Sequence, residues 1–146
     1  MACASLAGGD RVIAIYAERL KKRGHEVFVV AFPPPKPSLR EQVRSLLKEW
    51  KWISVKNQPT HFDYTDVPHK LIAHRPPITD ADVPDADVVV ATWWQTAEWV
   101  ANLSEAKGAK AYFIQHYEVF DYLPKERAAA TWSLPLHKSH YLEVVG

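Results

Sequence analysis

Cysteine is almost absent from this chain of 146 residues, which contains only Cys3. One thiol cannot form an internal disulfide, and so low a cysteine content is typical of proteins kept in a reducing cytosol. The sequence also lacks an apolar run near the ~20 residues that a membrane-spanning helix needs. Its first residues show no basic segment followed by a long apolar one, as a secretory signal would. We therefore expect a cytoplasmic protein without a transmembrane segment.

Net charge is also small, at +1. A chain with this charge offers no overall electrostatic attraction for nucleic acid or for an anionic membrane, so neither is an expected partner. Two enzyme motifs are missing from the sequence. There is no G-x-S-x-G for a hydrolase nucleophile and no G-x-G-x-x-G for a dinucleotide-binding loop. We expect no cofactor.

The remaining composition is ordinary for a soluble globular protein, with 47% hydrophobic and 24% charged residues. A length of 146 residues suffices for a sizeable core, so we expect a single domain over residues 1–146. The six tryptophans and eleven prolines indicate aromatic-lined surfaces and rigid loops.

The clearest strand lies at residues 87–92, DVVVAT, after a Pro-Asp turn. Three consecutive valines predict a strand buried on both faces, as in a parallel sheet. Residues 27–32 and 111–115 show the same pattern, and residues 52–55 and 70–73 are shorter candidates. Because open α/β sheets bind ligands at the carboxyl ends of their strands, the residues that follow these strands are the candidate site.

Helical spacing of apolar residues alternates with these strands. Asp10 is the expected N-cap of a helix that stops at Gly24, and Ser38 is the expected N-cap of an amphipathic helix reaching Trp50. A third helix is expected over residues 93–107, with Gly108 as its stop, and a short fourth over 124–130. The order predicts an α/β fold, a Rossmann-like parallel sheet with helices on both faces.

The expected sheet has no clear first strand before its first helix. Residues 2–7, ACASLA, are a poor strand sequence. Either they form a degenerate strand or the chain begins after the first strand.

Three segments resemble a known family. The segment GGDRVIAIYAERLKKRGHEVFVV resembles the first Gly-Gly loop, helix and second strand of the amino-terminal domain of family 4 retaining glycosyltransferases, which have two Rossmann-like halves (the GT-B architecture). The segments DADVVVATWWQTAEWV and AKAYFIQHYEVFDY resemble a subgroup linked to bacterial polysaccharide and rhamnose-containing glycan assembly. The resemblance covers roughly residues 8–137.

The resemblance implies that this chain is the acceptor-side half of such an enzyme. In that family the second half carries most of the nucleotide-sugar site and a pair of glutamates spaced E-x7-E. The implied partners are therefore a nucleotide-sugar and a glycan or lipid-linked acceptor, engaged only together with a second domain. Alone, the chain is expected to have negligible transferase activity.

Two groups of site residues follow from the resemblance. Gly8 and Gly9 are expected to bind the donor diphosphate, because backbone N–H groups at a helix N-terminus attract anions; the alternative is a flexible lead-in to the helix. By position, the strand ends imply six residues at the acceptor or the cleft: Thr92, Trp93, Gln115, His116, Tyr117 and Glu118. His116 is the leading candidate for a polar contact to a sugar or phosphate, the alternative being a hydrogen-bonded loop histidine. We assign no catalytic residue.

Trp93 and Trp94 are adjacent, so on a helix they point about 100° apart and cannot share one role. Tryptophan faces can stack on sugar rings, but such residues after a buried strand more often fill the core. We expect one of the two to lie in the core and the other near the cleft.

Several motifs in the sequence are explained by chance spacing or by local structure rather than by catalysis. The spacing E-x7-E occurs three times among nine glutamates, and the two D-x-D pairs at residues 80–82 and 85–87 have turn and strand-entry neighbours. His137 and His140 would share a helical face, but they have no obvious further ligand. We expect no metal site.

A second hypothesis belongs to a different class. A half-domain without its first strand exposes a sheet edge, which invites pairing with another chain. The chain would then be a non-catalytic interaction module that forms homo-oligomers. A nucleotide-binding domain that acts alone is a third, weaker hypothesis, because no Gly-rich loop follows a strand.

Overall fold

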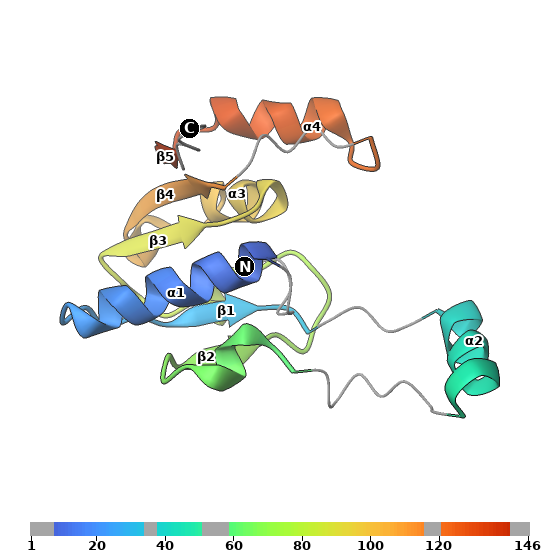
Figure 1. Cartoon of the computed structure of the whole chain (residues 1–146). Helices are drawn as coiled ribbons and strands as arrows, with labels where there is room; N and C mark the ends of the chain where they lie inside the picture. The colour runs from blue at the N-terminus through green and yellow to red at the C-terminus, as the bar shows by residue number, and fades with distance from the viewer. Residues whose placement is uncertain (1–7, 34–37, 51–58, 116–120, 141–146) are drawn as a thin grey trace, which may run out of the picture. The chain divides into compact units, whose positions relative to one another are not determined.

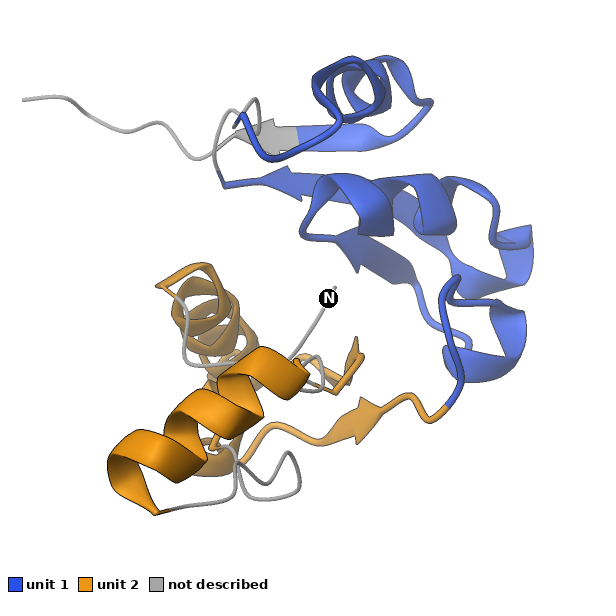
Figure 2. Cartoon of the chain, turned by 90° about the vertical axis from the view of Figure 1, so that its right-hand side faces the viewer, with its two compact units in different colours: residues 1–2, 74–146 blue, residues 3–73 orange. Residues whose placement is uncertain are grey.

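The computed structural model describes residues 8–33, 38–50, 59–115 and 121–140. Its residues group into two compact units, unit 2 (Cys3–Ala73) and unit 1 (Met1–Ala2 with His74–Gly146), which Figure 2 colours separately. Both units combine helices with short parallel strands, so the protein has a mixed α/β structure (Figure 1). The strand candidates at residues 2–7 and 52–55 lie outside the described residues.

Unit 2 contains a two-stranded parallel sheet, in which Val30 lies opposite Lys70. The helix α1 contacts a short 3-10 helix, η2, that precedes the second strand. The elements are α1 (Gly8–Lys22), β1 (Val29–Ala31), α2 (Leu39–Glu49), η2 (His61–Tyr64) and β2 (His69–Leu71). The strands expected at residues 27–32 and 70–73 are confirmed. The first is shorter than its expected range, and the second begins one residue earlier and ends two residues earlier than expected.

The end of α1 follows the sequence prediction and its start does not. Gly24 has a φ of 93°; its N–H donates to the carbonyl of Lys21 (3.0 Å), and the N–H of His25 donates to that of Leu20 (3.2 Å). This pattern closes a helix with a glycine in the left-handed region. Asp10, the expected N-cap, lies in the first turn instead, because the helix includes Gly8 and Gly9.

Unit 1 contains a three-stranded parallel sheet in the order β3-β4-β5. Its strands are β3 (Val88–Ala91), β4 (Ala109–Ile114) and β5 (His137–His140). Its helices are η3 (Asp80–Asp82), α3 (Trp94–Ala101), η4 (Glu105–Lys107), α4 (Lys125–Ala130) and η5 (Thr131–Ser133). The strands expected at 87–92 and 111–115 and the short helix expected near 124–130 are all present.

Two elements of unit 1 differ from expectation. The third helix ends at Ala101 rather than near 107. The ammonium of Lys110 donates to the carbonyls of Ala101 and Leu103, and a cation suits the C-terminal end of a helix. The fifth strand, β5, was not predicted. Since His137 and His140 lie in that strand, the helical face assumed for them does not exist.

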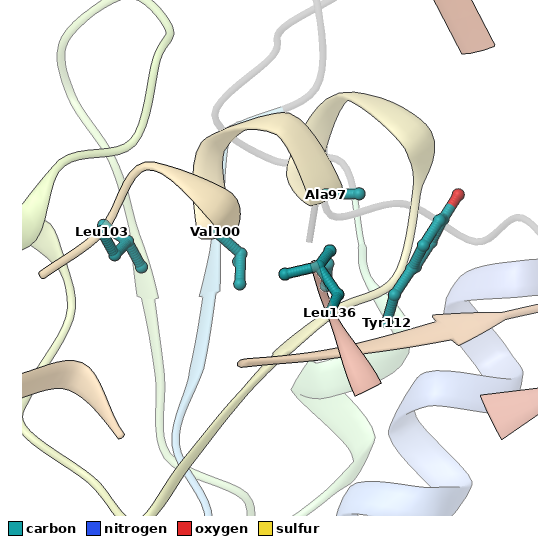
Figure 3. Close-up of a cluster of buried hydrophobic side chains, with 6 residues drawn as sticks. Ala97, Val100, Leu103, Tyr112 and Leu136 are labelled. Atoms are coloured by element: carbon teal, nitrogen blue, oxygen red, sulfur yellow. The ribbon is translucent and has the colours of Figure 1, made fainter. Parts of the chain in front are cut away.

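The core of unit 1 lies between α3 and the sheet. Figure 3 shows Ala97 and Val100 of α3, Leu103 after it, Tyr112 of β4 and Leu136 before β5 gathered into one cluster, which also includes Ala91. Tyr112 and Ala97 are fully buried. Burial of an aromatic and several aliphatic side chains at one place stabilises the contact between helix and sheet.

The expectation that the strand at 87–92 is buried on both faces is wrong. Val88 is 53% exposed and Val90 47% exposed, whereas Ala91 is fully buried. Strand residues alternate between faces, and β3 is the edge strand of its sheet. Only one face of β3 is therefore packed against α3.

Gly108 closes the turn before β4 at a point where no side chain fits. Its φ is 85°, and a Cβ placed there would lie 2.2 Å from the carbonyl oxygen of Ala86 and 2.5 Å from the carbonyl carbon of Asp87. The N–H of Ala109 donates to the carbonyl of Asp87 (2.8 Å) beside this contact. The two chain segments can approach so closely only because residue 108 has no side chain.

We predict that Gly108→Ala lowers the free energy of unfolding of unit 1 by about 3 kcal/mol or more, because it adds a backbone clash to left-handed strain. Gly24→Ala is the matched control. Gly24 also has a positive φ, but a Cβ there meets nothing within 4 Å, so a loss of only about 1 kcal/mol is expected. Urea unfolding monitored by hydrogen exchange measures the free energy of unfolding of both variants. Equal losses for the two variants would contradict the role of the Gly108 contact.

Candidate functional site

The candidate site lies where β3 and β4 end. The two strands are parallel, and Ala91 lies opposite Tyr112. Thr92 follows β3 directly and Gln115 follows β4 directly. The side-chain amide of Gln115 donates to the carbonyl of Thr92 across a long distance of 3.5 Å. Two of the residues expected at the acceptor or the cleft are thus adjacent at the carboxyl ends of the strands.

The turn from β3 into α3 is held by one side chain. The hydroxyl oxygen of Thr96 accepts from the N–H groups of Thr92 (3.0 Å) and Trp93 (2.9 Å), and the hydroxyl donates to the carbonyl of Trp93 (2.7 Å). Thr96, a buried threonine in the first turn of α3, therefore satisfies the N–H groups of two residues that precede the helix. This role was not predicted from the sequence, where Thr96 lies five residues after the end of β3.

The side chains of this turn have different environments. Trp94 is buried in unit 1, and the guanidinium of Arg127 lies 5.4 Å from the centre of its ring. Trp93 is only partly buried. The hydroxyl oxygen of Thr92 is buried and has no hydrogen-bond partner among the described residues. A partly exposed indole and a threonine hydroxyl therefore accompany Gln115 at the end of the sheet.

An ion pair connects α3 to α4 behind this turn. Both Nε and Nη2 of Arg127 donate to the carboxylate of Glu98, each at 2.7 Å. The hydrogen bond and charge of Glu98 raise the pKa of the Arg127 guanidinium. Two parallel hydrogen bonds of this kind fix geometry, so they help to hold the N-terminal turn of α3 in place.

The other expected site residues lie elsewhere or outside the described residues. Gly8 and Gly9 begin α1, in unit 2. A Cβ at Gly8 would meet nothing within 4 Å, so the backbone around Gly8 leaves room for a side chain. His116, Tyr117 and Glu118 lie in the segment 116–120, outside the described residues.

Three of the D-x-D carboxylates, those of Asp80, Asp82 and Asp85, form contacts that hold segments of unit 1 together. One carboxylate oxygen of Asp82 accepts from the N–H (2.8 Å) and hydroxyl (2.9 Å) of Thr79, and the other lies 2.8 Å from Nε2 of His74. Asp80 accepts from the N–H of Ser104 (3.0 Å), and hydrogen bonds from the hydroxyl and the N–H of Ser104 lower the pKa of Asp80. The exposed carboxylate of Asp85 forms an ion pair with the mostly buried ammonium of Lys107.

The pair of His74 and Asp82 was not found in the sequence, where eight positions and two prolines separate the residues. Burial disfavours the charged form of Asp82, but the hydrogen bonds from His74 and Thr79 outweigh it, and the pKa of Asp82 is lowered from 3.8. Nδ1 of His74 also lies 2.7 Å from the carbonyl oxygen of Arg75. The pair therefore fixes the loop that leads into β3.

Within the described parts of the chain, no three histidine, cysteine, aspartate or glutamate side chains are grouped as metal ligands would be. None of the described helices is long and apolar enough to span a bilayer. Comparisons with protein-family models, with curated proteins and with solved structures found no match to this chain.

We predict that Asp82→Asn lowers the free energy of unfolding at neutral pH by about 2 kcal/mol, because hydrogen bonds to a charged acceptor are lost. Since the folded-state pKa is lowered, this stabilisation is present above the unfolded-state value near 3.8 and is lost as the pH falls through the lowered value. The difference between the variant and the original protein should therefore shrink in acid. Urea titrations at a series of pH values measure it.

The matched control is Asp85→Asn, which removes a carboxylate that is 75% exposed. Its partner Lys107 is only 12% exposed, so a loss of about 1 kcal/mol, smaller than that for Asp82→Asn, is expected. The assignment fails if Asp82→Asn costs no more than this control, or if its cost persists unchanged at low pH.

Proposed function

We propose that this chain is the acceptor-side half of a two-domain retaining glycosyltransferase of the GT-B architecture, similar to those of polysaccharide assembly. The reaction is transfer of a sugar from a nucleotide-sugar to a glycan or lipid-linked acceptor. The chain contributes acceptor binding. The nucleotide-sugar site and catalysis are assigned to a second half, so this chain alone is inactive.

The observation that carries the proposal is that Thr92 and Trp93 follow β3, Gln115 follows β4, and the Gln115 amide donates to the carbonyl of Thr92 (3.5 Å). In α/β sheets, ligands usually bind at the carboxyl ends of the parallel strands. Sugars are recognised by an aromatic face combined with hydrogen-bonding hydroxyl and amide groups. The partly buried Trp93, the Thr92 hydroxyl and the Gln115 amide supply these three kinds of group.

The chemistry of the strand ends suits binding better than catalysis. Among the described residues at these ends, Thr92, Trp93 and Gln115 carry no ionisable group that would serve as a general acid or base. An amide, a hydroxyl and an indole orient a polar ligand. This agrees with a half-enzyme that holds the acceptor while another domain stabilises the leaving diphosphate.

We predict that rhamnose-containing oligosaccharides bind weakly and shift the indole NMR resonance of Trp93. Trp93→Ala should lower the affinity about fivefold, through loss of stacking. Thr92→Val keeps the side-chain shape and removes a hydroxyl that has no described partner, so it should lower the affinity by a similar factor while leaving stability nearly unchanged.

Trp50→Ala is the control for these variants, because Trp50 is 89% exposed in unit 2. It should bind the oligosaccharides as the original protein does. Titration with UDP-, GDP- and dTDP-sugars under the same conditions separates acceptor from donor binding. Binding that is unchanged by Trp93→Ala, or sugar transfer by this chain alone, would contradict the proposal.

A second candidate function rests on the exposed edge of the sheet in unit 1. Val88 and Val90 are about half exposed on β3, which has no neighbour on one side among the described strands. Valine-rich edge strands pair readily with other chains. Under this proposal the chain is a non-catalytic module that self-associates through β3.

If β3 is such an interface, the protein forms a dimer whose population rises with concentration. A charge on the exposed face opposes edge pairing, so Val90→Lys should shift the dissociation constant at least tenfold towards monomer, about 1.4 kcal/mol. Leu20→Lys on α1 alters another exposed apolar residue and should leave the dimer intact. Size-exclusion chromatography with light scattering measures this. A monomer at all concentrations would exclude the second candidate.

A further inference from the structure

The helix α2 is defined at both ends by its own residues. The hydroxyl of Ser38 accepts from the N–H of Glu41 (3.3 Å), and the Glu41 carboxylate accepts from the N–H of Ser38 (2.7 Å). The backbone N–H of Ser38 lowers the pKa of Glu41, which keeps the acceptor ionised. Trp50 ends the helix in the left-handed conformation, with a φ of 50°. Local sequence therefore specifies this helix, as a capping box does.

The apolar face of α2 is exposed. Leu39 is 82%, Val43 54%, Leu47 77% and Trp50 89% exposed, and Leu46 is exposed as well. At ~100° per residue these side chains fall within one stripe roughly 100° wide. A stripe of this width on a helix of a globular protein ordinarily packs against a core. In α2, all of whose residues are described, only Gln42 is buried.

A row of cations runs beside this apolar stripe. Arg40, Arg44 and Lys48 are spaced four residues apart, so they lie along one side of the helix. They line one shallow hollow together with the apolar row: Leu39, Arg40, Val43, Arg44, Leu47 and Lys48. In projection along the helix axis Glu41 lies about 20° from Lys48, beside the basic row, and Glu49 lies about 100° from Lys48. The apolar and basic rows are therefore adjacent, and the acids occupy the remaining side of the helix.

We infer that α2 binds in the plane of an anionic lipid bilayer. Helices that lie at a membrane interface combine leucine and tryptophan on one face with lysine and arginine beside it. The complementary surface must present negative charge next to a continuous apolar medium, which anionic headgroups above acyl chains supply. A protein helix would need a groove, whereas a bilayer accepts a single convex helix.

This inference revises the expectation drawn from the net charge. The net charge of +1 is summed over the whole chain. Because salt screens electrostatic interactions over about 10 Å, a surface bound to α2 interacts mainly with the charges near that helix. Within α2 the three cations lie on the side that would face headgroups. The inference does not rest on the proposed sugar-transfer function, since no residue of the β3–β4 site takes part.

Flotation with lipid vesicles tests the inference on the full chain. Vesicles of phosphatidylcholine mixed with phosphatidylglycerol should carry the protein upward, and vesicles of phosphatidylcholine alone should carry much less. Added salt should release it, because exposed charges are screened. Leu47→Glu should weaken binding about tenfold or more, since burial of a leucine is replaced by burial of an acid.

Matched variants separate a specific face from general stickiness. Tyr64→Glu alters a side chain that is 76% exposed in the same unit and should leave vesicle binding unchanged. Arg44→Gln should weaken binding to the anionic vesicles about fivefold. Arg23→Gln changes an exposed arginine in the turn after α1 and should have little effect. Circular dichroism shows that each variant keeps its fold.

Three results would overturn the inference. The first is absence of binding to the anionic vesicles by the folded protein. The second is binding that Leu47→Glu and Tyr64→Glu reduce equally, or that is as strong on phosphatidylcholine alone. The third is a dimer, seen by light scattering without lipid, that Leu47→Glu dissociates, because α2 would then be a protein interface.

Discussion

The close approach of Gly108 to the backbone of Ala86 and Asp87 is the constraint on which unit 1 depends. It brings the start of β4 against the start of β3 and so sets Val88 opposite Ala109. In that register Ala91 at the end of β3 lies opposite Tyr112, and β4 continues to Ile114. Thr92 and Gln115 then meet as a consequence of a contact at the other end of the strands. A residue without a side chain thus positions a site to which it contributes no group.

Two apolar surfaces in this protein face outward although their sequences are typical of buried elements. In β3, Val88 and Val90 lie on the face opposite α3, and about half of each side chain is exposed. In α2 the whole stripe from Leu39 to Trp50 is exposed. Periodicity specifies which residues share a face but not what covers that face. The two surfaces differ in their flanking charge, and only α2 carries a basic row beside its apolar residues.

Polar groups in the loops of unit 1 are used mainly for structure. Asp82 connects Thr79 and His74, Asp80 binds the backbone of Ser104, and Thr96 supports the turn after β3. These contacts hold the segments before and after β3. Among the described residues that directly follow β3 and β4, Thr92, Trp93 and Gln115 are uncharged.

The sequence by itself determined the elements whose signals are local: the capping box of α2, the glycine that ends α1, the valine-rich strand β3 and its exit into α3. It also determined that Thr92 and Gln115 follow strands. Only the tertiary structure decided that β3 is an edge strand, that Lys110 donates to the carbonyl of Ala101 at the end of α3 and that Asp82 pairs with His74. The reason is physical. Caps and periodicity act within a few residues, whereas burial, strand order and ion pairing depend on partners distant in the chain.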